Sequence, residues 1–339
     1  MSLLRYILRR LIVMVPVVLG VMTLTFILSR LMPGDPVVAY LPLGKPDPEL
    51  YLRMRRFLWL DRPIILQFFK YLGDLFSGNW GRSISIAHGS SVWVLIVERL
   101  PRTLDIAILS ILIATFLGTK TGLISATNRN KPKDTLIRGI ALIGVSVPVF
   151  YLGVILQYWL SYQIPWFPAT GYKTRWYPNP PFITGFRIVD SLLSGEIYLI
   201  ADYLYHLILP VFCLTFITLA GITRQSRSNM LEVLDQDYIR TARAKGCSEK
   251  DVINIHAQRN SLIPTVTVIG LSFAALLSGA VLTETTFNLN GLGKLLTDSI
   301  YGTDYWVLNA LVFVITIFFV SVNLTIDVLY AILDPRIRY

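Results

Sequence analysis

The sequence predicts an all-α integral membrane protein with six membrane-spanning helices and a small helical lobe on the external side. Of its 339 residues, 54% are hydrophobic and only 15% are charged, whereas soluble domains carry about 25% charged residues. Six apolar runs reach the length of about 20 residues that a helix needs to cross a bilayer. Such runs are too long for barrel strands, and a helix satisfies its own backbone hydrogen bonds in lipid.

The predicted spans lie at 11–31, 104–126, 136–158, 204–222, 262–282 and 306–329. The first follows three arginines, as a signal peptide would. Its apolar stretch is longer than usual and no Ala-x-Ala site follows, so we interpret it as an uncleaved anchor. Lys120 lies near one end of the second span, where its long stem reaches toward the interface. Pro148 predicts a kink in the third span, because the carbonyl of Gly144 loses its donor.

Basic residues concentrate on one side of these spans. The segments 1–10, 127–138, 223–261 and 330–339 hold 16 basic and 7 acidic residues, whereas 32–100, 159–203 and 283–305 hold 12 of each. Because cytoplasmic segments carry the excess of Lys and Arg, we expect both termini and the 223–261 loop in the cytoplasm. This asymmetry accounts for the net charge of +10, and we prefer it to nucleic-acid binding.

The predicted topology divides the chain into an N-terminal tail with the first helix (1–31), an external lobe (32–100) and a core of five helices (101–339). Proline and glycine at 33–36 and 42–48 stop the first helix. The lobe then predicts a helix from Glu49, a second over 64–76 and an amphipathic stretch over 92–100 that leads into the second span.

The external loop 159–203 is rich in aromatic residues and proline, notably at 165–168, 176–178 and 180–182. An interfacial aromatic belt and a proline-stiffened cap both fit this composition. A surface that docks an external partner or stacks on a substrate ring fits it too.

The loop 223–261 carries the strongest local signals. We expect a helix over 229–245, ended by Gly246 in the left-handed conformation. Ser248 and Asp251 resemble a capping box that opens a second helix. Pro264 is expected near the start of the fifth span, where a missing N–H costs little. The small residues near this turn would let another protein approach closely.

Several stretches of the sequence resemble the motifs of one protein family. They are the loop sequence 237–252 with 259–264, and the segments 4–11, 32–36, 60–63 with Gln67, 78–83, 146–150, 291–296 and 333–339. Together they resemble the permease subunits of binding-protein-dependent ABC importers, and more narrowly the B-type subunit of dipeptide and oligopeptide importers. The loop is similar to the Glu-Ala-Ala…Gly coupling motif, although Arg240, Thr241 and Ala242 stand at the Glu-Ala-Ala positions.

The resemblance implies the type I importer fold, with six helices in the plasma membrane of a prokaryote. It implies four kinds of partner: a second homologous permease, two cytoplasmic ATPases, an external solute-binding protein and the bilayer. The chain has no Gly-x-x-x-x-Gly-Lys-Ser/Thr loop, so we assign ATP hydrolysis to the partners and expect a non-catalytic subunit without cofactor. The residues expected to couple to the ATPase are Tyr238, Arg240, Thr241, Ala242, Ala244, Lys245 and Gly246.

Four residues are candidates for the pathway or its gates. Ser146 and Pro148 lie at the interruption of the third span. Glu284 lies near the external end of the fifth span, where a gating residue and a headgroup-level carboxylate are both open interpretations. Asn323 lies four residues before Asp327 on the sixth span, near its cytoplasmic end.

Other functions remain as alternatives. Oligosaccharides or nickel chelates are alternative cargoes. The aromatic loop is compatible with oligosaccharides, because sugar rings stack on aromatic faces. A secondary transporter would want carboxylates or paired charges near the middle of the membrane, and the spans show almost none. An intramembrane enzyme has no supporting His/Asp, Ser/Lys or His-Glu-x-x-His arrangement. Two cysteines and three scattered histidines predict neither a disulfide framework nor a metal site.

Overall fold

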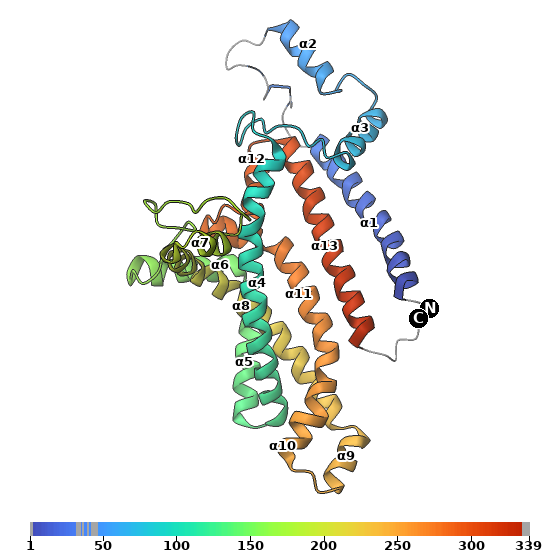
Figure 1. Cartoon of the computed structure of the whole chain (residues 1–339), viewed down its shortest axis with the longest axis vertical. Coiled ribbons are helices and arrows are strands. Elements are labelled where there is room, and N and C mark those ends of the chain that lie inside the picture. Colours follow the sequence, from blue (N-terminus) through green and yellow to red (C-terminus); the bar gives the residue numbers. More distant parts are fainter. Residues whose placement is uncertain (1–2, 32–34, 36, 39–40, 42–46, 334–339) are drawn as a thin grey trace.

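The computed structural model describes residues 3–31, 35, 37–38, 41 and 47–333. Within these residues every regular element is a helix, and one isolated bridge joins Arg82 to Ser91. The long helices run along the long axis of the molecule (Figure 1). The α2 and α3 helices lie at one end, here called the lobe end, and α9 and α10 lie at the other, the hairpin end.

The elements follow one another without a strand between them. They are α1 (Leu3–Leu31), α2 (Pro48–Phe57), α3 (Ile64–Phe76), α4 (Val92–Thr127), α5 (Pro132–Ser146), α6 (Val149–Leu156), the π-helical η2 (Gln157–Gln163), α7 (Arg187–Leu193), α8 (Ile197–Leu234), α9 (Asp237–Ala244), α10 (Glu249–Asp251), the π-helical η3 (Val252–Ala257), α11 (Gln258–Phe287), α12 (Leu292–Tyr301) and α13 (Tyr305–Leu333).

Among the described residues, four helices are long and apolar enough to cross a membrane unaided, and they lie in α1, α4, α8 and α13. Two further candidates are bent pairs, Pro132–Ser146 with Val149–Gln163 and Glu249–Leu262 with Pro264–Leu277. Counting each bent pair as one span gives the six spans that the sequence predicts. The all-α membrane fold is therefore confirmed.

The third predicted span is broken rather than kinked. Its two halves meet at 100°, and α6 points away from the bundle in Figure 1. Val147 is extended, with φ −87° and ψ 123°, as expected for a residue that precedes proline. Pro148 is then the N-cap of α6, a position that needs no N–H for the helix. The proline predicts where the helix is interrupted, but the angle between α5 and α6 depends on the helices packed around them.

The α4 and α8 helices form the main packing seam. A Cβ on Gly118 would come within 2.8 Å of the Ile222 side chain, and one on Gly122 within 2.6 Å of Ser226. Small residues four apart thus bring the two backbones together, as in other membrane helix pairs. Tyr203, Leu207 and Ile111 lie in the core cluster beside this seam.

The predicted lobe helices are confirmed, the second at its expected limits of Ile64–Phe76. None of the α2 side chains is buried, whereas α3 packs against α1 through Tyr71 and Leu75. Most of the motif at 32–36 lies outside the described residues, and so does 334–339 of the C-terminal motif.

Two local expectations, one in the 223–261 loop and one just after it, are wrong. The helix predicted over 229–245 is two helices, because α8 ends at Leu234 and the chain turns at Asp235 and Gln236 before α9. The turn lets Ile239 pack back against Met230. Pro264 lies inside α11 as its seventh residue, and not in a first turn. The helix bends by 48° there.

Candidate functional site

The hairpin, residues 235–257, closes one end of the molecule (Figure 1). Its two arms are α9 and the α10–η3 segment, which leads directly into α11. One face of each arm is apolar and turns inward. Ile239, Ala242, Val252 and Ala257 form a buried cluster with Met230 of α8. Ala126 of α4 belongs to the same cluster, so this small core fixes the hairpin on the ends of α8 and α4.

The turn between the arms is determined by its own residues. Gly246 has φ +82°, which a side chain would disfavour. The Cys247 N–H donates to the Ala242 carbonyl at 3.2 Å, and the Gly246 N–H donates to Arg243 at 3.0 Å. This pair of bonds is the Schellman ending of a helix. The predicted left-handed cap is confirmed.

The second arm begins with the predicted capping residue. The Ser248 hydroxyl accepts from the Asp251 N–H at 3.2 Å and donates to the Asp251 carboxylate at 2.6 Å. Arg243 makes two hydrogen bonds to Glu249 across the turn, at 3.1 and 2.8 Å. These contacts raise the pKa of the Arg243 guanidinium above its ordinary value. The two arms of the hairpin are therefore joined by the Arg243–Glu249 ion pair as well as by the buried apolar cluster.

The predicted contact residues divide between two faces. Ala242 is buried in the cluster beneath α9, so it supports the hairpin from inside. The others are exposed, namely Tyr238, Arg240, Thr241, Ala244, Lys245 and Gly246. The Tyr238 hydroxyl accepts a hydrogen bond from Asn260 at 2.9 Å, which orients its ring at the edge of the hairpin. A Cβ built on Gly246 would meet no atom within 4 Å, so the turn faces open space.

A buried ion pair that the sequence analysis missed braces the helices above the hairpin. Asp134 is fully buried at the start of α5 and receives two hydrogen bonds from Arg227 of α8, both at 2.8 Å. Ser125 of α4 and the Asn130 N–H complete its partners at 2.5 and 3.0 Å. Ninety-three residues separate the two charges, and no local pattern pairs them.

An open hollow of about 470 Å³ lies at the break between α5 and α6. Pro148 lines it, as do Leu214 and Thr218 of α8 and Ser272 and Leu276 of α11. The wall is apolar apart from a few hydroxyl groups. Of the four pathway candidates, the structure brings Pro148 to this hollow.

The other candidates lie elsewhere. The Ser146 hydroxyl donates to the Leu142 carbonyl at 2.8 Å, which satisfies it locally. Asn323 is half-buried on α13 and does not line the hollow. Its neighbour Asp327 pairs with Arg10 of α1 at 3.1 Å. The predicted pathway roles of Ser146 and Asn323 stay predictions.

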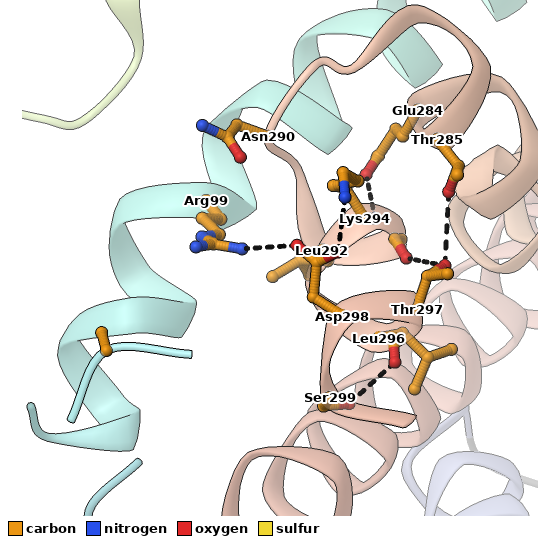
Figure 2. Close-up of polar contacts among 12 residues, drawn as sticks. Arg99, Glu284, Thr285, Asn290, Leu292, Lys294, Leu296, Thr297, Asp298 and Ser299 are labelled. Carbon is orange, nitrogen blue, oxygen red and sulfur yellow. Dashed lines mark hydrogen bonds and ion pairs between the residues drawn. The ribbon is translucent and has the colours of Figure 1, made fainter. Parts of the chain in front are cut away.

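Glu284 lies at the centre of a second polar site, the clamp, made of the end of α11, the loop 288–291 and α12. Its side chain is fully buried, and Thr103 of α4 donates to it at 2.6 Å. The Lys294 N–H donates to its other oxygen at 3.1 Å, and Thr103 in turn accepts from the Leu292 N–H at 2.8 Å. In Figure 2, Arg99 reaches from α4 toward the Asp298 carboxylate of α12. The Glu284 carboxylate thus fastens α12 to α4, and its predicted gating role stays a prediction.

The clamp explains why glycines occur at 291 and 293. A Cβ on Gly291 would lie 2.4 Å from a Glu284 oxygen. One on Gly293 would lie 2.5 Å from the Val281 Cα atom. The Lys294 side chain pairs with Asp298 along α12, and Arg99 lies 4.0 Å from the same carboxylate. The sequence singles out both the glycines and Glu284, but it does not predict that Glu284 is buried against Thr103.

The loop 159–203 is organised around Asp190 of α7. This buried carboxylate accepts from the N–H groups of Thr184 and Gly185 at 2.7 and 2.9 Å, and from the Thr184 hydroxyl at 2.7 Å. Burial opposes its ionisation, but these hydrogen bonds outweigh burial and hold the pKa of Asp190 below its ordinary value. Trp166 and Trp176 remain exposed on the loop. The proline-rich segment is therefore an ordered cap with aromatic groups on its surface.

These features define a class: a multi-pass helical membrane protein with a broken span beside an open hollow and a capped hairpin at one end. Two family models match the chain. The binding-protein-dependent transport system inner membrane component matches 118–339, and the N-terminal part of the same kind of membrane component matches 3–107. The chain belongs to this family, and it is a permease subunit of a binding-protein-dependent ABC importer.

Curated relatives match nearly the whole chain. It is 41% identical to the di/tripeptide transport system permease protein DppB of Pseudomonas aeruginosa (strain UCBPP-PA14), over 99% of both chains. It is 38% identical to the dipeptide transport system permease protein DppB of Escherichia coli (strain K12), also over 99% of both. It is 38% identical to the oligopeptide transport system permease protein AppB of Bacillus subtilis (strain 168), over 98% of this chain and 99% of that one.

A solved structure shares the fold. The match is to a chain of the MetNI methionine ABC transporter in inward-facing conformations, with a TM-score of 0.55 and 16% identity. It covers 71% of this chain and 96% of that one. The predicted type I importer fold is confirmed.

Proposed function

We propose that this chain is the non-catalytic permease subunit of an ATP-driven importer of dipeptides and short oligopeptides. The relatives at 38–41% identity are di/tripeptide, dipeptide and oligopeptide permeases, which supports this cargo class. The observation that carries the mechanism is the hairpin, whose core is satisfied internally while its outer face is exposed. A rigid element with a free outer face is suited to dock a partner.

The partner in this proposal is a cytoplasmic ATPase subunit with a groove that receives Tyr238, Ala244 and Gly246. The hairpin continues into α11 through η3 and packs on the end of α8. Those two helices also line the hollow beside Pro148. Closure of an ATPase pair would move the hairpin as a rigid body and shift both helices against α5 and α6, which opens or closes the pathway.

The proposal includes two further partners. A second homologous permease would cover the open side of this hollow, so that each chain forms half of the pathway. An external solute-binding protein would deliver the cargo at the lobe end. This arrangement puts the hairpin and both termini in the cytoplasm and the regions 32–100 and 159–203 outside, in agreement with the distribution of basic residues.

Reconstitution tests the cargo. The chain is assembled in proteoliposomes with its second permease, ATPases and binding protein, and uptake of labelled dipeptides, oligopeptides, oligosaccharides and a nickel chelate is measured. We expect peptide uptake that needs both ATP and the binding protein. Uptake of oligosaccharide without peptide would overturn the cargo class. Transport that follows an ion gradient in the absence of ATPases would overturn the mechanism.

A further inference from the structure

A pocket at the lobe end has no part in the mechanism above. It lies between the end of α1, the α3 helix and the start of α13, and holds about 90 Å³ of space. One buried water needs only about 10–15 Å³. Aromatic side chains form much of its wall, among them Trp59, Tyr71, Trp80 and Tyr305. A mostly apolar cavity with a few convergent polar groups is the usual form of a ligand site.

Three polar atoms in this pocket are buried without a hydrogen-bond partner among the described residues. They are Nε of Arg30, Oε1 of Gln67 and Oδ1 of Asn309, one from each of the three helices. The Gln67 amide is oriented by its other atom, because its Nε2 donates to the Arg62 carbonyl at 2.8 Å. Leaving such groups unpaired is costly, so an occupant should supply both an acceptor and a donor.

The pocket carries a net positive charge. Lys70 and Asp74 neutralise each other through contacts of 2.5 and 2.6 Å. No carboxylate of the described residues lies within 4.0 Å of the Arg30 guanidinium, which rests over the Phe26 ring at 5.1 Å. One uncompensated cation beside an aromatic wall favours an anion.

Backbone strain at the rim points the same way. Trp59 has φ +59°, a conformation that bulky side chains rarely adopt. Its ring lines the pocket and receives the Lys70 ammonium at 5.8 Å. Strain of this kind persists where the surroundings enforce it, and it clusters at ligand sites.

The neighbouring surface is apolar. Ile65, Phe69 and Phe76 follow the helical repeat along one exposed face of α3, and all three are more than half exposed. Ile27 and Leu28 at the end of α1 are also exposed. An amphipathic helix beside the end of a membrane span lies at the level of lipid headgroups.

We propose that this pocket binds the headgroup of a membrane phospholipid. The phosphodiester accepts hydrogen bonds from Arg30, and a headgroup hydroxyl or ammonium donates to Gln67 and Asn309. The acyl chains follow the exposed apolar faces of α1 and α3. Inorganic phosphate matches the charge, but it lacks the chains that this neighbouring surface would hold.

The test uses the purified importer complex, stripped of lipid and titrated with palmitoyl-oleoyl-phosphatidylglycerol, with bound lipid counted by native mass spectrometry. Arg30→Gln removes the charge-assisted bonds to the phosphate, and the nearly isosteric Gln67→Glu places a negative charge beside that phosphate. Each should therefore weaken binding of one lipid by about tenfold or more. Arg56→Gln is the matched control, since Arg56 is exposed on α2 and does not line the pocket.

The outcomes separate the possible occupants. Weaker binding in either pocket variant with an unchanged control supports the proposal, and Gln67→Glu serves alone if Arg30→Gln does not assemble. Equal lipid retention by all the proteins that assemble means an unspecific lipid shell and overturns it. Displacement of the lipid by inorganic phosphate at an equal concentration also overturns it, in favour of a free-anion site.

Discussion

The hairpin and the clamp show two ways of building a polar site at opposite ends of one bundle. In the hairpin, the Gly246 turn and the Ser248 cap are made by residues within a few positions of one another. In the clamp, Glu284 depends on Thr103, which is 181 residues away. The hairpin leaves its outer face exposed, whereas the clamp buries its carboxylate completely.

This contrast separates stability from function. Groups that are satisfied inside the molecule hold helices together, so changing them should lower stability. Groups on an exposed and locally determined surface contribute little to folding, so changing them should alter docking.

The largest expected effect is in the clamp. Glu284→Ala removes the acceptor for Thr103 and the Lys294 N–H, which leaves two buried donors unpaired. At about 1–3 kcal/mol for each such group, we expect a loss of roughly 2–6 kcal/mol in the free energy of unfolding. Thermal unfolding of the purified protein in detergent measures it. Glu98→Ala is the control, because Glu98 is an exposed carboxylate on α4. Equal changes in melting temperature for both variants would contradict a structural role for the clamp.

The next effect is in the hairpin. Gly246→Val should reduce ATP-driven uptake by about tenfold while ATP hydrolysis continues, because the branched side chain occupies the docking turn. The matched control is Gly89→Val. Gly89 has φ +80°, close to the +82° of Gly246, and a Cβ at either position meets no atom within 4 Å. Both variants carry the same backbone penalty of about 1–2 kcal/mol. Similar losses of uptake in the two would attribute the effect to strain alone.

The smallest effect concerns the loop 159–203. The pKa of Asp190 is lowered in the folded protein, so its stabilising contribution is present above its ordinary pKa of about 4 and is lost as the pH falls through the lowered value. Asp190→Asn should cost about 1 kcal/mol at pH 6, and the difference from the wild type should shrink below about pH 4. Melting temperatures of both proteins from pH 6 to pH 3 measure this. A difference that does not change with pH would exclude ionised Asp190 as the cause.

The sequence predicts what local physics decides. The limits of α3, the left-handed Gly246 and the Ser248 cap all follow from nearby residues, and all are confirmed. The position of the break at Pro148 follows from the missing N–H, but its angle of 100° does not.

Long-range pairings could not be predicted in this way. Nothing near Asp134 identifies Arg227 as its partner, and nothing near Glu284 identifies Thr103. The helix expected over 229–245 is wrong for a related reason. The turn at Asp235 contains neither glycine nor proline, and beyond it Ile239 joins the buried cluster that holds Met230.

The native cysteines allow the most direct test of the central claim, that the hairpin is a cytoplasmic docking element for an ATPase. Cys247 is exposed beside Gly246, whereas Cys213 is buried. A membrane-impermeant maleimide should label Cys247 in inside-out vesicles and not in right-side-out vesicles, and assembly with the ATPase subunits should protect it. Cys247→Ser controls for the site of labelling. Labelling from the outside, or labelling that ATPase assembly leaves unchanged, would contradict the account.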